Sequence, residues 1–302
     1  MLPAVSGFFV TAAFLLIGIG LRRLPAFPRE SGAVLNNYVI YVPLPALVLL
    51  RIPGLAFSPA LLTPALMPWA MLLVSVAGVL SVSRLLRWER GVTGSLLLLI
   101  PLGNTSFFGI PMVQAFFGDS GVPYAVIYDQ LGSFPSLAIY GSLIVAIYGA
   151  GARPTVRGVA RRIATFPPFL ALLLALSLRG VTYPAAVSDS LATLAATLVP
   201  VVMIAVGFQL SLRISREEAA PLALGLAGKL VVAPGLALLA CRLLGLDGEA
   251  VRVAVFESGM PPMVSGGALA IMAGLAPSLS AALVGLGILA SFVTLPVLFR
   301  LL

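Results

Sequence analysis

Histidine is absent from this chain of 302 residues, cysteine occurs once, and charged residues make up only 9%. Without histidine there is no Ser-His-Asp triad, no histidine proton relay and no histidine zinc site. The single Cys241 excludes an intramolecular disulfide and a cysteine-based metal cluster. Soluble domains carry about 25% charged residues. Because the deficit extends over the whole chain, we expect no attached soluble domain.

Most of the chain consists of long apolar segments. The chain is 60% hydrophobic with a mean hydropathy of +1.13. The runs are continuous and do not alternate, which favours membrane-spanning helices over a β-barrel. We therefore predict an all-α membrane protein with ten transmembrane helices. They cover approximately Leu2–Leu21, Ala33–Leu50, Pro64–Leu85, Val92–Phe117, Val122–Tyr148, Pro167–Leu178, Ala185–Leu212, Ala219–Leu244, Ala250–Leu275 and Ser278–Leu302.

The basic residues predict the topology. The net charge is +8, but the basic side chains stand in short clusters between apolar runs, which is typical of topology signals and not of a nucleic-acid surface. Of the 18, 12 fall in the odd-numbered loops, which the positive-inside rule places in the cytoplasm with both termini outside. These 12 are Arg22, Arg23, Arg29, Arg84, Arg87, Arg90, Arg153, Arg157, Arg161, Arg162, Arg213 and Arg216.

The longest polar connection, Ala150 to Ala164, divides the chain into two groups of five spans. We predict a first five-helix repeat over residues 1–149, a cytoplasmic linker loop over 150–164 and a second repeat over 165–302. An odd number of spans per repeat gives the second repeat the inverse orientation, as in many secondary transporters. At an offset of 157 residues, Pro43 falls on Pro200, Asn104 on Pro261 and Gly109 on Gly266.

Spans four and nine each contain a proline, glycine and polar cluster near mid-membrane, over residues 101–111 and 257–267. Such clusters break a helix, and a break at this depth lines a polar cavity or is buried in protein. Helix N-termini created by the breaks suit a carboxylate, and freed carbonyls suit a cation. The alternative is a proline-kinked helix without a site. The candidate substrate-binding residues are Asn104, Thr105, Ser106, Gly109, Pro261, Ser265, Gly266 and Lys229.

Three ionisable residues lie inside predicted spans: Asp129, Lys229 and Glu257. A charge at the bilayer centre costs about 2.5–3.5 kcal/mol on insertion scales, so each is a candidate site residue. Lys229 could instead snorkel or pair with Asp129, and Asp129 could be an interfacial charge. Glu257 directly precedes the second break and could hold sodium, hold a proton or pair with a cationic side chain. The candidate ion-coupling residues are Glu257, Asp129 and Ser258.

The stretches Gly103–Pro111, Phe117-Gly118, Gly259–Pro262 and Thr294–Pro296 resemble the auxin efflux carrier family, within the bile acid/sodium symporter-like superfamily. The resemblance covers essentially the whole chain. It implies a scaffold and a transport domain, with a small organic anion such as an auxin-like weak acid, malate or malonate bound where the broken helices cross. Family members often have asparagine where this chain has Ser265. The stretch Glu257–Met260 looks like the sodium-ligating stretch of the bile acid symporter branch, which implies sodium coupling as an option.

We therefore expect a secondary transporter of small organic anions in the plasma membrane, without a cofactor but with sodium or proton coupling open, and not an enzyme. Its partners would be the anion and the bilayer, not nucleic acid, and a homodimer stays open. Three alternatives remain: a sodium-coupled symporter of a bile-acid-like anion, a channel-like or receptor-like anion-binding protein, and an intramembrane enzyme. The enzyme would need Ser258 or Ser265 with Lys229, an arrangement that no motif supports. No Walker A sequence is present.

Overall fold

A computed structural model describes residues 2–28, 30–55, 58–149, 155–210 and 218–302. Within these residues the chain is helical nearly throughout, and the only β-type pairing is an isolated bridge between Gly103 and Pro262. This confirms the predicted all-α class. The chain forms two compact units. The first comprises Met1–Pro59, Ser106–Val126 and Arg161–Leu210, and the second comprises Ala60–Thr105, Ile127–Ala160 and Ser211–Leu302.

Each compact unit therefore takes segments from both halves of the sequence. The units are not the predicted repeats, whose division at residues 150–164 stays a prediction. Residues 150–154 of the predicted linker, and Arg29, Arg153, Arg213 and Arg216 of the basic clusters, lie outside the described residues. The described part of the linker contains a helix, α10 (Val156–Ala164), which has no buried residue and carries Arg157, Arg161 and Arg162.

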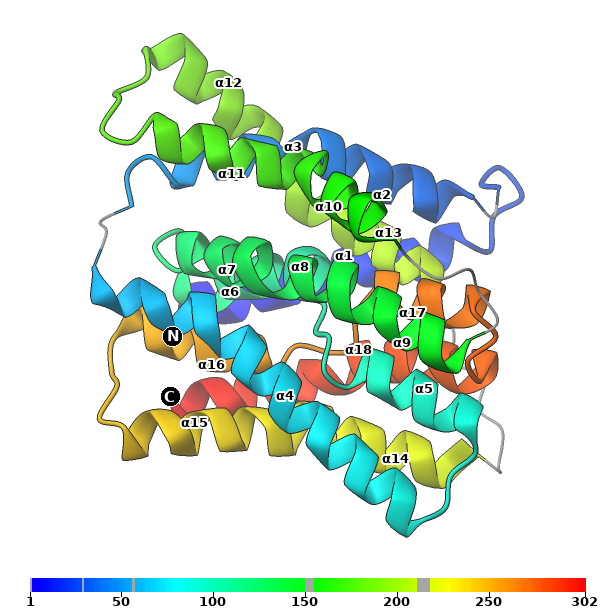
Figure 1. Cartoon of the computed structure of the whole chain (residues 1–302). Helices are drawn as coiled ribbons and strands as arrows, with labels where there is room; N and C mark the ends of the chain where they lie inside the picture. Colours follow the sequence, from blue (N-terminus) through cyan, green and yellow to red (C-terminus); the bar gives the residue numbers. More distant parts are fainter. Residues whose placement is uncertain (1, 29, 56–57, 150–154, 211–217) are drawn as a thin grey trace. The chain divides into compact units, whose positions relative to one another are not determined.

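The first unit is a group of packed helices that includes α1 and α13 (Figure 1). Helix α1 contacts α13 and α6, while α3 contacts α11 and α12. Close approach of α1 to α13 depends on Gly18 and Gly207, where a Cβ would lie 2.2 Å from the Ile204 carbonyl oxygen and 2.1 Å from that of Leu15. The helices are α1 (Leu2–Leu21), α2 (Ser31–Tyr41), α3 (Pro43–Arg51), α6 (Ile110–Phe117), α11 (Pro167–Ser177), α12 (Ala185–Ala196) and α13 (Leu198–Gln209).

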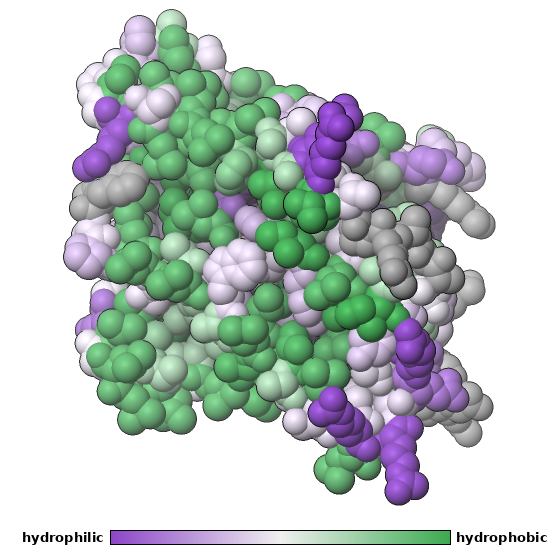
Figure 2. All heavy atoms as spheres, in the orientation of Figure 1, coloured by the Kyte–Doolittle hydropathy of each residue, from purple (hydrophilic) through white to green (hydrophobic). Residues whose placement is uncertain are grey.

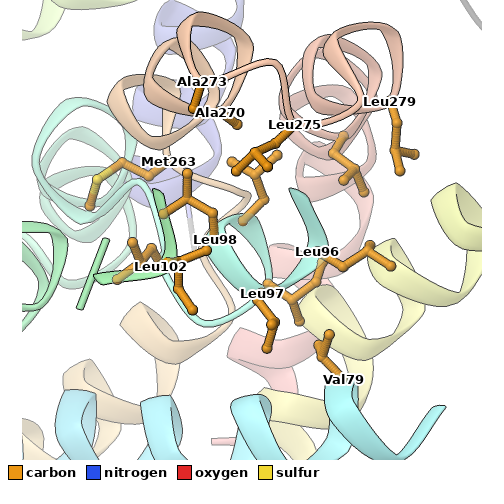
Figure 3. Close-up of a cluster of buried hydrophobic side chains, with 14 of the residues drawn as sticks. Val79, Leu96, Leu97, Leu98, Leu102, Met263, Ala270, Ala273, Leu275 and Leu279 are labelled. Atoms are coloured by element: carbon orange, nitrogen blue, oxygen red, sulfur yellow. The ribbon is translucent and has the colours of Figure 1, made fainter. Parts of the chain in front are cut away.

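The second unit contains the longest helices, α4 (Leu62–Leu85) and α18 (Pro277–Leu301). Its core gathers leucines of α5 (Arg90–Leu99) against α17 (Val264–Met272) and α18 (Figure 3). Three π-helical turns interrupt its other helices. The remaining elements are η3 (Asp129–Ser133), α8 (Phe134–Ser136), η4 (Leu137–Gly141), α9 (Ser142–Tyr148), α14 (Ala219–Ala227), η6 (Gly228–Val232), α15 (Ala233–Leu243) and α16 (Glu249–Ser258), with α7 (Val122–Tyr128) crossing the boundary between the units.

Six stretches of described helix are long and apolar enough to span a membrane, and α10 with α11 makes a seventh if this pair, bent by 59°, is one span. Three further apolar helices are shorter, over Phe8–Leu21, Arg90–Leu99 and Thr105–Phe117. Ten full-length spans are therefore not established by helix length. Exposed side chains such as Leu66 and Leu73 of α4 are apolar, and Figure 2 shows hydrophobic residues over much of the visible face. Such a surface suits lipid contact.

Candidate functional site

The helix of span four is interrupted where the sequence predicts it. Helix α5 ends at Leu99, and helix resumes with a π-helical turn, η2 (Thr105–Gly109), that continues into α6. Between them lie Pro101 and Gly103. Proline has no amide hydrogen, and glycine loses more conformational freedom in a helix than other residues, so these residues favour an end to the helical hydrogen-bond ladder.

Span nine is interrupted in the same way. Helix α16 ends at Ser258 and α17 begins at Val264, with Pro261 and Pro262 between them. The predicted second break is therefore confirmed, and helix resumes at Val264.

The two interruptions pair with each other through their backbones. The amide of Asn104 donates to the Pro261 carbonyl at 2.8 Å, and the amide of Met263 donates to the Leu102 carbonyl at 3.1 Å. These bonds flank the antiparallel bridge between Gly103 and Pro262. Backbone groups freed from a helix inside a membrane need such partners. The pairing therefore makes a mid-span crossing of the two interrupted segments possible.

A small cavity of about 10 Å³ lies beside this crossing, within the second unit. About 10–15 Å³ is enough for one water molecule. Its wall includes the predicted site residues Thr105, Lys229, Glu257 and Ser258. The other lining residues are Pro68, Met71, Leu72, Ser75, Pro101, Leu102, Gly103, Tyr128, Ser133, Ser136 and Ala233.

Lys229 is held inside the protein and does not snorkel. It lies in η6 and is 4% exposed. Its Nζ donates to the Ser258 carbonyl oxygen at 3.4 Å, a carbonyl left free where α16 ends. A Cβ built on Gly103 would lie 3.2 Å from Nζ, so the glycine leaves room for the ammonium beside the crossing. This lysine thus puts a positive charge against both interruptions.

Glu257 lies in the last turn of α16 and is fully buried. Neither of its carboxyl oxygens has a hydrogen-bond partner in the described part of the chain. An ionised carboxylate in such a place is costly unless a cation or a proton neutralises it. The nearby Lys229 lines the same cavity.

Asp129 is also fully buried, which does not fit an interfacial charge. Its carboxylate accepts a hydrogen bond of 2.6 Å from Thr105 Oγ1 and another of 2.6 Å from Gln130 Nε2. The π-helical turn η3 carries it, and Gly132 of this turn packs on the ring of Pro68. Asp129 therefore anchors the residue at which helix resumes after the first interruption.

The other predicted site residues are more dispersed. The buried Asn104 has a side-chain nitrogen without a partner among the described residues. In α17, Ser265 is exposed, whereas Gly266 is buried near Leu99. Ser106 and Gly109 belong to the first unit and the rest to the second.

Sequence reasoning missed several polar residues in the cavity wall: Ser75, Tyr128, Ser133 and Ser136. Three of them come from span five, whose stretch from Tyr128 to Ser136 also contains Gly132 and Pro135. That combination of polar side chains with glycine and proline in an apolar span is the same signal that identified spans four and nine.

An interrupted pair of apolar helices, crossing through backbone bonds beside buried ionisable side chains, is the arrangement of a membrane transport protein. The comparisons with known proteins agree. Residues 11–156 and 152–299 match the family model described as membrane transport protein, and the chain belongs to this family. The resemblance to the auxin efflux carriers is confirmed at this level.

A curated relative supports the same class. The chain is 24% identical over 261 residues to a protein named an uncharacterized transporter from Methanocaldococcus jannaschii. The alignment covers 83% of each chain. This chain is therefore a multi-pass membrane transport protein.

Proposed function

We propose that the protein is a secondary transporter of small organic anions that works by alternating access at the helix crossing. The observation that carries this proposal is the backbone pairing of the two interruptions beside Lys229. Helices that begin at Thr105 and Val264 present free amide groups near the crossing, and these favour a carboxylate. The buried side-chain nitrogen of Asn104, which has no partner among the described residues, adds a neutral donor.

Counterflow in proteoliposomes tests the transport cycle. External unlabelled carboxylate should accelerate the efflux of the same labelled carboxylate, because a carrier returns faster when loaded. Candidate acids such as malate, malonate and aromatic weak acids are first ranked by thermal shift of the purified protein. Neutral amide analogues of the best acid should bind much more weakly. Equal binding of acid and amide would contradict an anion site, and efflux that external substrate does not accelerate would favour a channel.

For ion coupling, we propose that the ammonium group of Lys229 neutralises Glu257 in place of a bound sodium ion. The cavity has room for about one water molecule, and its wall already contains an ammonium group and a carboxyl group that can neutralise each other. Transport should therefore persist when choline replaces sodium. A strict sodium requirement would overturn this coupling proposal without affecting the anion site.

A further inference from the structure

A second and larger hollow lies on the second unit, beside the small cavity. It is a groove of about 380 Å³ between α4, α5, the α14–η6 segment and α15. Its wall includes Val74, Gly78 and Val82 of α4, with Leu236 on the α15 side. Apart from Ser75 and Trp88, the lining side chains are apolar or glycine. The groove is therefore suited to a hydrocarbon chain and not to a polar solute.

The groove follows a membrane-spanning helix. Its lining residues on α4 run from Val74 to Val82, which is about 12 Å along the helix axis. One end reaches Trp88, and the other reaches Ser75 and Ala233, which also line the small cavity. Tryptophan is enriched at the membrane–water boundary. The groove thus extends from one membrane surface towards the middle of the bilayer.

Positive charge stands at the surface end. Arg84 lies in the last turn of α4, and Arg87 immediately precedes Trp88. Both side chains are exposed, and neither makes an ion pair within the described part of the chain. The positive-inside rule predicts that this end faces the cytoplasm, where anionic lipid headgroups attract basic residues next to a span.

We propose that this groove is a binding site for an anionic phospholipid. One acyl chain lies between α4 and α15, and its headgroup phosphate contacts Arg84 and Arg87. The positive charge at the mouth and the apolar wall behind it favour a molecule that has both a phosphate headgroup and an acyl chain. The site is separate from the anion site of the transport cycle, although Ser75 and Ala233 connect their walls.

Tryptophan fluorescence provides a direct test because the chain has only Trp69 and Trp88. In the Trp69→Phe variant, Trp88 reports on the groove. The purified full-length variant is titrated in mixed micelles with phosphatidylglycerol or phosphatidylcholine that carries brominated acyl chains. The lipid concentration at half-maximal quenching should be lower for phosphatidylglycerol than for phosphatidylcholine. Each arginine that contacts the headgroup should lower it roughly fivefold. In the reverse variant, Trp88→Phe, quenching of Trp69 should show no headgroup preference.

Further substitutions separate the headgroup from the groove. Arg84→Gln with Arg87→Gln should abolish the preference for phosphatidylglycerol. Gly78→Leu should reduce quenching of Trp88 by filling the groove, since a Cβ at Gly78 meets no atom within 4 Å. Gly235→Leu is the matched control: it adds the same side chain to the exposed Gly235 of α15, which also has open space but does not line the groove.

The outcomes are distinct. Equal quenching by the two lipids, unchanged by Gly78→Leu, would show ordinary solvation by lipid and overturn the proposal. A preference that survives the double arginine substitution would overturn the headgroup assignment. Size-exclusion chromatography verifies that each variant is folded before titration.

Discussion

The backbone amide of Asn104 hydrogen-bonds to the carbonyl of Pro261 at a distance of 2.8 Å, although 157 residues separate them. This bond fixes the Asn104 backbone at the crossing. The side-chain nitrogen is not used in it and has no partner among the described residues. A buried donor without a partner in the described part of the chain is available for a substrate.

Replacing Asn104 by alanine should therefore impair transport while leaving expression near normal. Loss of one hydrogen bond to a charged ligand should lower transport efficiency roughly 10- to 100-fold. Initial rates of carboxylate uptake into proteoliposomes measure this. Asn37→Ala alters an exposed asparagine of α2 and should have little effect. Wild-type transport by Asn104→Ala would place the substrate elsewhere.

Lys229 and Glu257 are both buried and line the same cavity, so removing one of these two ionisable groups should destabilise the protein. Lys229→Met leaves the fully buried carboxyl group without its cationic neighbour. The expected cost is about 3–5 kcal/mol, as for other buried pairs from which one partner is removed. Adding Glu257→Gln to this variant should restore much of the loss. Thermal unfolding in detergent of the two single variants and the double variant measures the coupling.

An exposed ion pair serves as the control for these Lys229 and Glu257 variants. Arg51 and Asp119 are 2.5 Å apart, with side chains 31% and 53% exposed. Asp119→Asn should cost at most about 1 kcal/mol because solvent screens the pair. If the effects of Lys229→Met and Glu257→Gln simply add, the two groups do not interact, and the sodium-replacement proposal loses its basis.

Gly18 should be intolerant of a larger side chain, whereas Gly20 on the same helix should not. A Cβ at Gly18 would lie 2.2 Å from the backbone oxygen of Ile204 in α13, and one at Gly20 meets nothing within 4 Å. Backbone atoms cannot move aside without separating the two helices. Gly18→Ala should therefore lower the melting temperature, and Gly20→Ala should leave it unchanged or slightly raise it. Equal melting temperatures for both variants would contradict the tight packing of α1 on α13.

Residue 157 should be accessible from the cytoplasm only. The test uses Arg157→Cys in a Cys241→Ala background, so that one thiol remains. A membrane-impermeant maleimide should label it in inside-out vesicles and not in intact cells. Asp247→Cys, in an exposed loop on the predicted outer side, should give the reverse pattern. Labelling of position 157 from outside intact cells would invert the topology.

The interruptions could be predicted because their cause is local. Proline and glycine act on their own residue and the preceding turn, so Pro101, Gly103, Pro261 and Pro262 indicate where helix must stop. The comparison at an offset of 157 residues even places Asn104 opposite Pro261, the residue to which it bonds. The position of each ionisable residue within its span could likewise be counted from the sequence.

The neighbours of those residues could not be predicted. Counting along a span gives depth in the membrane but not the direction in which a side chain points. The hydrogen bond from Thr105 to Asp129 and the reach of Lys229 to Ser258 depend on that direction. Both Asp129 and Lys229 also lie in π-helical turns, which rotate the following side chains relative to a regular helix. The division into two compact units likewise depends on packing between distant segments.

The crossing of the two interrupted helices has a consequence for how such proteins diversify. Its hydrogen bonds join main-chain atoms, at Leu102 with Met263 and at Asn104 with Pro261. The side chain of Asn104, which takes no part in these bonds, can therefore be exchanged without loosening the joint between the helices. Under the proposed function, the substrate that binds would depend on side chains, whereas the joint between the helices depends on main-chain atoms, so one can change while the other is kept.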